Sequence, residues 1–320
     1  MELAGQHLVR LGRIGAQTRG FKAAFHRRLR YLRQSPHHRR RDVGLVVAVS
    51  DNLYPLRLKA PSIDSPDRYP IEDLRYQKTG AADTSVLMLH GWGGGAQSFA
   101  NLSSILSTYC TIWSPSLPGF GASPEPPAVW DSFDYAEVVH RWALQHIETP
   151  FDIIAHSFGG RIAIALAARH PDLVRCLILI SSAGLKQRRT LPTRMKIAGG
   201  SILRLAGELC GGRIKEALNR RRERLGSADW RAASPIMRDV LSRVINEDLT
   251  DCLRRVQAPT MLIWGTEDTA TPLRMAEKML KLLSKAELVK IPKAGHFCYL
   301  DAPSEALSAI WKHLSLPKAW

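Results

Sequence analysis

From about residue 73 onward, short apolar segments alternate with longer amphipathic ones, and this rhythm limits the fold more than any other feature of the sequence. Runs that are apolar throughout are typical of strands buried on both faces of a parallel sheet. Strands that alternate with helices indicate a doubly wound α/β sheet. We expect strands at residues 86–90, 110–114, 151–155, 176–181, 260–264 and 286–291, and helices at 97–107, 134–148, 158–170, 272–283 and 303–314.

One long interval, between the expected strands 176–181 and 260–264, breaks this rhythm. It reads as helices interrupted by Gly pairs, and we interpret residues 186–250 as a helical cap inserted into an α/β core of residues 42–185 and 251–320. The cap should determine the substrate. Its apolar face toward the sheet would carry Ile197, Ile202, Leu203, Leu205 and Leu209. The cluster Arg220, Arg221, Arg222 and Arg224 could attract an acidic substrate, and a solvated helix face is the alternative.

The net charge of +16 is concentrated in two segments. Residues 1–41 hold eleven Lys and Arg against one acid, residues 186–225 hold twelve against three, and the rest of the chain is close to neutral. Neither zinc-finger spacing nor regularly interleaved aromatic residues accompany them, so we expect no nucleic-acid partner. We interpret residues 1–41 as a basic N-terminal extension. Weak contact with an anionic membrane surface, through this extension or the cap, is the alternative.

The cysteines and the N-terminal composition bear on the compartment. Five cysteines, an odd number without metal-ligand spacing, predict a reducing compartment and no metal site. We therefore expect a cytoplasmic protein. Residues 1–41 lack the continuous apolar core of a secretion signal, but they are rich in Arg and nearly free of acids, so organellar targeting is the alternative. No run approaches the roughly 18 apolar residues that a membrane span needs.

The strongest chemical motif follows the expected strand 151–155. Ala155-His156-Ser157-Phe158-Gly159 leads directly into an expected helix, the pattern of a nucleophile elbow. The turn needs small flanking residues, and it exposes the hydroxyl of Ser157 at a helix N-terminus, where backbone N–H groups favour negative charge. We predict that Ser157 is the nucleophile.

A glycine-rich turn, His90 to Gly95, follows the expected strand 86–90. In a hydrolase such a loop supplies one oxyanion-hole N–H and the residue after the nucleophile supplies the other. We therefore assign the two backbone donors to Trp92 and Phe158. A phosphate-binding loop is the rival interpretation, but neither Gly-Lys-Ser/Thr nor GxGxxG spacing is present.

Two further turns carry an acid and a histidine. Asp268 and its neighbour Glu267 follow the expected strand 260–264, and His296 follows the expected strand 286–291. The order Ser157, acid, His296 is that of an α/β-hydrolase catalytic triad, and each member comes directly after a strand. We expect His296 to act as general base and the acid to orient it; the turn alone leaves Asp268 and Glu267 both open.

Five residues beside these motifs are candidates for substrate contact: His90, Gly91, His156, Arg161 and Phe297. Arg161 lies four residues after Ser157 on the same expected helix, where it could bind a substrate carboxylate. A structural ion pair is the alternative interpretation for Arg161.

Five segments, quoted in one-letter code, together resemble the α/β-hydrolase superfamily, in particular small bacterial carboxylesterases and hydrolases of meta-cleavage products. They are HGWGGG, SLPGFGAS, AHSFGG, WGTED and AGHF. The resemblance spans about residues 73–315 and is weaker over the cap. It implies an eight-stranded, mostly parallel sheet, a helical lid after strand six, no cofactor, and Asp268 rather than Glu267 as the acid.

The sequence departs from the family pattern at two points. Ala155 stands where the first Gly of the elbow is usual, a replacement that the family tolerates. The turn before Asp268 lacks the Arg that carbon–carbon hydrolases often carry, which favours ester cleavage. We therefore expect a serine hydrolase of small or medium, largely apolar carboxylic esters. Carbon–carbon bond hydrolysis and a non-catalytic receptor or scaffold on the same fold are the alternatives.

Overall fold

The computed structural model of the chain describes residues 65–186 and 227–317. Every described element belongs to the compact unit Pro61–Trp320. The basic extension 1–41, the cap positions named above between residues 197 and 224, and Cys210 lie outside the described residues.

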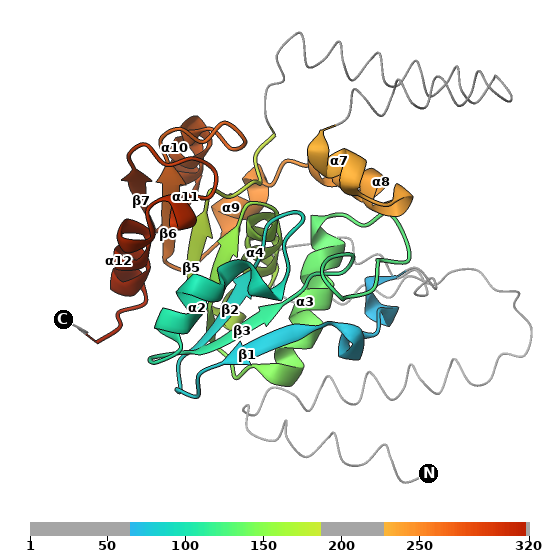
Figure 1. Cartoon of the computed structure of the whole chain (residues 1–320), viewed down its shortest axis with the longest axis horizontal. Helices are drawn as coiled ribbons and strands as arrows, with labels where there is room; N and C mark the ends of the chain where they lie inside the picture. The colour runs from blue at the N-terminus through green and yellow to red at the C-terminus, as the bar shows by residue number, and fades with distance from the viewer. Residues whose placement is uncertain (1–64, 187–226, 318–320) are drawn as a thin grey trace, which may run out of the picture. The chain divides into compact units, whose positions relative to one another are not determined.

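A seven-stranded sheet forms the centre of the described chain, with the strand order β1-β3-β2-β4-β5-β6-β7 (Figure 1). β1 runs antiparallel to β3, and the other neighbouring pairs are parallel. The strands are β1 (Tyr76–Thr79), β2 (Ser85–Leu89), β3 (Thr111–Pro115), β4 (Phe151–His156), β5 (Val174–Ile180), β6 (Thr260–Gly265) and β7 (Ala286–Ile291). The expected mostly parallel α/β sheet is confirmed, with seven strands among the described residues where the resemblance implied eight.

Helices cover both faces of the sheet. The α-helices are α2 (Ala100–Leu106), α3 (Ser132–His146), α4 (Phe158–Arg169), α7 (Ala228–Ala232), α8 (Pro235–Val244), α9 (Thr250–Arg255), α10 (Leu273–Leu282), α11 (Cys298–Asp301) and α12 (Pro303–His313). Short 3-10 helices are η2 (Pro66–Arg68), η3 (Ile71–Asp73), η4 (Ala96–Phe99) and η5 (Pro171–Leu173). None of these helices has the length and apolar composition needed to cross a membrane.

Alternate residues of each central strand enter two separate cores, as the two-residue period of a strand requires. Leu87 and Leu89 of β2 join the core that includes α3, α4, α9 and α10, whereas Val86 and Met88 join the core that includes α2, α11 and α12. Both cores hold side chains that are completely buried. Burial on both faces explains why the central strands are largely apolar and could be found from the sequence.

The structure differs from the sequence prediction at the edges of the sheet. β1 was not predicted, because its four residues, Tyr-Gln-Lys-Thr, are all exposed and show no apolar pattern. The prediction that residues 286–291 are buried on both faces is wrong: only Ile291 of β7 is buried, since β7 is an edge strand. The expected helix 97–107 begins as η4 and becomes α-helical at Ala100.

The described end of the expected cap consists of α7 and α8. α8 begins at a Ser234 cap followed by Pro235, a residue pair typical of a helix start. Its buried face carries Met237, Val240 and Val244. The sulfur of Met237 accepts a hydrogen bond from the Tyr135 hydroxyl of α3 at 3.8 Å, so α8 packs against α3.

Candidate active site

Ser157, Asp268 and His296 lie at the carboxyl edge of the parallel sheet. Ser157 follows β4, Asp268 follows β6 and His296 follows β7. The glycine-rich turn that begins at His90 follows β2, which pairs with β4 in parallel register. Ligands of open α/β sheets bind beyond this edge, so the structure gathers the predicted residues where chemistry is expected.

The turn at Ser157 holds the backbone in an unusual conformation. Ser157 has φ 49° and ψ −109°, in the region that non-glycine residues rarely adopt. A Cβ on Gly159 would stand 2.2 Å from the carbonyl oxygen of Leu89, and one on Gly160 would stand 2.0 Å from the Ser182 hydroxyl. Both glycines are therefore required for α4 to pack this closely against β2 and the end of β5. Ala155 is fully buried, and its methyl group is accommodated.

A chain of hydrogen bonds joins the three predicted residues. The Ser157 hydroxyl lies 3.0 Å from Nε2 of His296. Nδ1 of His296 lies 2.9 Å from Oδ2 of Asp268. The carboxylate is an acceptor, so Nδ1 carries the hydrogen and Nε2 presents its lone pair to the hydroxyl of Ser157.

Asp268 is held by its own turn. Oδ1 accepts hydrogen bonds from the backbone N–H groups of Ala270 and Thr271, at 2.9 and 2.8 Å. Oδ2 accepts a third, from the Thr271 hydroxyl, at 2.7 Å. Burial by itself raises the pKa of Asp268, but the hydrogen bonds from His296 and Thr271 outweigh it and hold that pKa below its ordinary value. The carboxyl is therefore ionised at neutral pH.

Glu267, unlike Asp268, makes no hydrogen bond or ion pair with His296. Its side chain is exposed, and its backbone N–H donates to the carbonyl of Ala294. Thr271, whose hydroxyl also lies 3.3 Å from Nδ1 of His296, was not predicted from the sequence. The spacing Asp-x-x-Thr was the available signal, because short polar side chains in a turn commonly bond to backbone groups two or three residues away.

The two predicted backbone donors flank Ser157. Among the described residues, no acceptor within the protein faces the backbone N–H of Trp92 or of Phe158, the first residue of α4. The turn after β2 comes very close to Ser157, since a Cβ on Gly91 would stand 3.3 Å from the Cβ of Ser157. Neither N–H group is therefore engaged by the described part of the chain.

His90 and His156, predicted as substrate contacts, are instead buried parts of the framework. Nε2 of His90 accepts from the N–H of Leu117 at 2.9 Å, and Nδ1 lies 2.7 Å from the carbonyl oxygen of Gly91. Nε2 of His156 donates to the carbonyl of His296 at 3.0 Å. Burial lowers the pKa of each ring to about 4, so both are neutral at pH 7.

An aromatic cluster stands beside the two backbone donors. The ring of Trp92 lies 4.9 Å from that of Phe120 and 5.3 Å from that of Phe158, each in an edge-on arrangement. Tyr135 of α3 contacts Phe158 at 5.2 Å. Phe120 and Tyr135 were not predicted, because nothing in their local sequence marks two distant aromatic residues as neighbours. Trp92 is half-buried, whereas Phe120, Phe158 and Tyr135 are buried, so the ring of Trp92 is the part of this cluster that solvent reaches.

The other two candidates differ in environment. The Arg161 side chain is buried, and its guanidinium faces Glu247, with 4.0 Å to the carboxylate and 3.5 Å to the backbone carbonyl. The structure thus favours the ion-pair interpretation of Arg161 over substrate binding. Phe297 is 50% exposed, and its ring lies 5.4 Å from that of His296. Phe297 therefore stays a prediction as a substrate contact.

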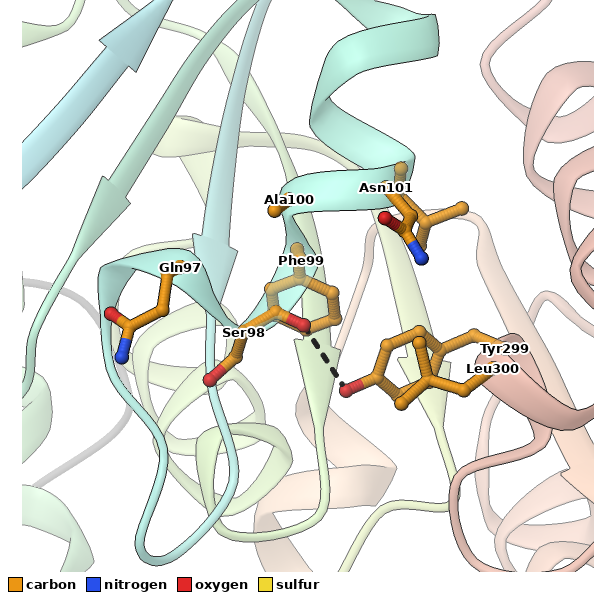
Figure 2. A pocket seen from close by; sticks show the side chains of 8 residues that line it. Gln97, Ser98, Phe99, Ala100, Asn101, Tyr299 and Leu300 are labelled. Atoms are coloured by element: carbon orange, nitrogen blue, oxygen red, sulfur yellow. Dashed lines mark hydrogen bonds between the residues drawn. The ribbon is translucent and has the colours of Figure 1, made fainter.

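A small pocket of about 160 Å³ lies between η4, α2 and α11 (Figure 2). Tyr299 donates a hydrogen bond across it to the carbonyl of Ser98 at 3.4 Å. None of its lining residues is Ser157, Asp268 or His296. Tyr299 also contacts the His156 ring at 5.3 Å, so the pocket backs onto the framework behind the site.

Known proteins resemble this chain in sequence and in fold. A family model described as alpha/beta hydrolase fold matches residues 84–303. The pimeloyl-(acyl-carrier protein) methyl ester esterase of Neisseria meningitidis is 30% identical over 242 residues, which cover 71% of this chain and 91% of that protein. The 2-hydroxy-6-oxo-6-(2'-aminophenyl)hexa-2,4-dienoic acid hydrolase of Metapseudomonas resinovorans is 22% identical over 265 residues, covering 76% and 88%.

Among solved structures, an esterase from Exiguobacterium antarcticum superposes with a TM-score of 0.61. It is 22% identical, and the match covers 76% of this chain and 95% of the esterase. At this identity the superposition establishes a shared fold.

Proposed function

The chain belongs to the alpha/beta hydrolase fold family, and from that premise we propose that it hydrolyses a carboxylic ester through an acyl-enzyme formed on Ser157. The observation that carries this proposal is the hydrogen-bonded series Ser157–His296–Asp268, with separations of 3.0 and 2.9 Å. Relatives named as methyl ester esterases support the same reaction class.

In the first step, Nε2 of His296 removes the proton of the Ser157 hydroxyl as the oxygen attacks the ester carbonyl. The buried, ionised Asp268 holds the Nδ1–H tautomer and stabilises the imidazolium that forms. The imidazolium then gives its proton to the departing alcohol. A water molecule activated by His296 hydrolyses the acyl-enzyme and regenerates Ser157.

The negative charge that develops on the carbonyl oxygen needs donors that are already in place. We assign this role to the backbone N–H groups of Trp92 and Phe158, which have no acceptor elsewhere among the described residues. The N-terminus of α4 adds its positive end at the same point. One such donor typically contributes about 3 kcal/mol to transition-state stabilisation.

For the substrate, we propose an ester whose acyl chain is apolar and whose alcohol is small. The relative from Neisseria meningitidis is named for a methyl ester of an acyl chain on a carrier protein. The half-buried ring of Trp92, packed against the buried rings of Phe120 and Phe158, supplies an apolar surface for such a chain. Methyl esters of medium-length fatty acids are therefore the first substrates to test.

The test is hydrolysis of p-nitrophenyl acetate, butyrate and octanoate, and of methyl octanoate, by wild type and Ser157→Ala. We expect butyrate and octanoate to be cleaved with higher kcat/KM than acetate. Ser157→Ala should lower kcat/KM by at least about 10⁴-fold, because the nucleophile is lost. Ser104→Ala is the matched control, since that hydroxyl is exposed on α2 and should be dispensable.

Two outcomes would redirect the proposal. Similarity to a relative named as a dienoic acid hydrolase favours a second candidate reaction, carbon–carbon cleavage of a meta-cleavage product. Turnover of such a dienoate together with inactivity on every ester would establish that alternative. Inactivity on both classes would favour a receptor or scaffold on the same fold.

We also propose that the protein works in the cytoplasm. The four cysteines among the described residues, Cys110, Cys176, Cys252 and Cys298, are buried free thiols, which suits a reducing compartment. Recovery of the native chain in the soluble cytoplasmic fraction is expected. Recovery with membranes that is reversed by high salt would instead favour the anionic-surface contact.

A further inference from the structure

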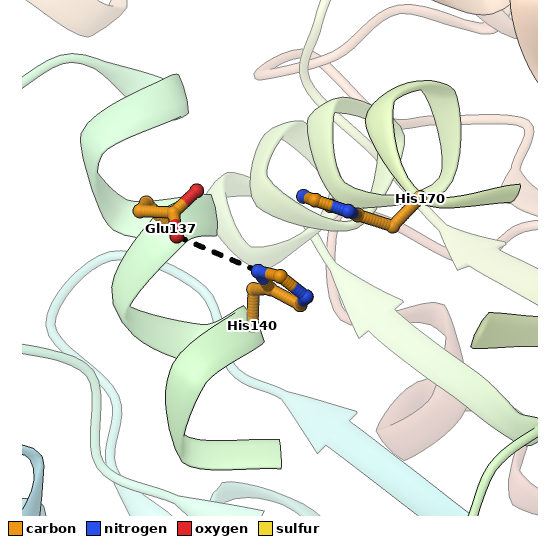
Figure 3. A group of neighbouring side chains, drawn as sticks. All are labelled: Glu137, His140 and His170. Carbon is orange, nitrogen blue, oxygen red and sulfur yellow. Dashed lines mark hydrogen bonds and ion pairs between the residues drawn. The ribbon is translucent and has the colours of Figure 1, made fainter. Parts of the chain in front are cut away.

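Three side chains of types that can bind metal ions, Glu137, His140 and His170, gather between α3 and the C-terminal end of α4 (Figure 3). Glu137 and His140 lie one turn apart on α3, and His170 ends α4 as its C-terminal cap residue. One ligand atom from each residue lies within 4.8 Å of the others. The cluster has no part in the proposed hydrolysis.

The packing of α3 on α4 brings these side chains together. The rings of His140 and His170 stack with 3.7 Å between their centroids and 21° between their planes. Nδ1 of His140 lies 3.5 Å from Oε1 of Glu137. Residues three apart on a helix share a face, and Glu-x-x-His is a spacing by which helices present metal ligands.

From this geometry we propose that Glu137, His140 and His170 form a binding site for a divalent transition-metal ion such as Zn²⁺. Two imidazoles and one carboxylate are a ligand set that suits Zn²⁺ and leaves a position for water. The Glu137 and His140 side chains are 28% and 17% exposed, so an ion can reach them from solvent.

Binding requires a small local adjustment. Ligand atoms around a tetrahedral Zn²⁺ lie roughly 3.3 Å apart, given metal–ligand bonds of about 2.0–2.1 Å. The ring torsions of His140 and His170 are soft, so each imidazole can turn until its lone pair points toward a common centre.

The consequence is a cross-link between two helices rather than a change in the reaction. His170 is thirteen residues beyond Ser157, roughly 20 Å along α4. An ion there ties the end of α4 to α3 and should stabilise the folded chain, because the three ligands are not gathered in the unfolded chain. Ester hydrolysis should be unchanged.

The test uses the full-length chain, freed of metal by chelation, titrated with Zn²⁺ by calorimetry and with Co²⁺ by visible absorption. We expect one site that raises the melting temperature and gives Co²⁺ d–d bands. His140→Ala and His170→Ala should each weaken binding at least tenfold and abolish the bands and the thermal shift. Glu137→Gln should weaken binding less, because a neutral oxygen ligand remains.

Other histidines provide the controls. His313→Ala, on α12, and the double variant His37→Ala/His38→Ala, in the N-terminal extension, should bind like wild type. The proposal is overturned if wild type shows no site at millimolar Zn²⁺. It is also overturned if binding is unchanged in both His140→Ala and His170→Ala, or is lost only in the N-terminal double variant.

Discussion

Ser157 occupies a backbone conformation that typically costs about 1–3 kcal/mol, and its neighbours explain how it is maintained. Its N–H donates to the carbonyl of Ile180, and its own carbonyl accepts from Gly160 and Ala183. These bonds fix the turn before any substrate arrives. The hydroxyl therefore points at His296 without further rearrangement, which is the preorganisation that nucleophilic catalysis needs.

At the same scale, the substitution Asp268→Asn tests which acid of the turn, Asp268 or Glu267, orients His296. The asparagine keeps the shape but presents a donor or a neutral oxygen to Nδ1 of His296, which disturbs the tautomer and removes the stabilising charge. We expect kcat for p-nitrophenyl butyrate to fall by roughly 10³–10⁴-fold. Glu267→Gln is the matched control and should keep wild-type kcat. A large loss in Glu267→Gln with little in Asp268→Asn would contradict the assignment.

At the scale of the elements, the elbow depends on how closely α4 approaches β2. Gly159→Ala would place a methyl group 2.2 Å from the Leu89 carbonyl, so the helix must shift. We expect a loss of about 3 kcal/mol in the free energy of unfolding, measured with urea, and a loss of activity. In Gly295→Ala the nearest atom to the new Cβ is 3.5 Å away, so this control should stay within about 0.5 kcal/mol of wild type. Equal stability of the two variants would contradict this account of the elbow.

The elements that could be predicted from the sequence are those whose own residues show a recognisable pattern, such as an apolar run or a required glycine. The central strands were found because burial on both faces makes them largely apolar. The elbow was found because the close approach of its helix leaves no room for a side chain at Gly159 or Gly160. β1 was missed because its stability comes from pairing with β3 rather than from apolar content. Some contacts form only when elements distant in the sequence pack together, so they could not be predicted. Examples are the aromatic cluster that includes Trp92, Phe120 and Tyr135, and the stacking of His140 on His170.

For the whole molecule, His90 and His156 make stability depend on pH. Their pKa of about 4 in the folded chain lies below the ordinary 6.5, so between these values the unfolded chain binds protons that the folded chain does not. The free energy of unfolding contributed by each ring is therefore complete above about pH 6.5 and is lost as pH falls toward 4. The slope in that interval approaches 1.4 kcal/mol per pH unit for each histidine.

The substitution His156→Gln isolates one of these contributions. We expect the loss of unfolding free energy between pH 7 and pH 5, measured with urea, to be about 2 kcal/mol smaller in His156→Gln than in wild type. His313→Gln, at the C-terminal end of α12, serves as the control and should show the wild-type difference. An identical pH dependence in wild type and His156→Gln would show that the ring does not remain neutral when buried.

The central claim is that Ser157 is a nucleophile activated by His296, and covalent labelling tests it most directly. The folded chain is treated with a fluorophosphonate probe, and the modified residue is located by mass spectrometry. We predict one label, on Ser157, that disappears in Ser157→Ala and is slowed at least about 10³-fold in His296→Ala, while Ser104→Ala labels like wild type. Absence of label from the folded wild type, or label that persists in Ser157→Ala, would contradict the claim.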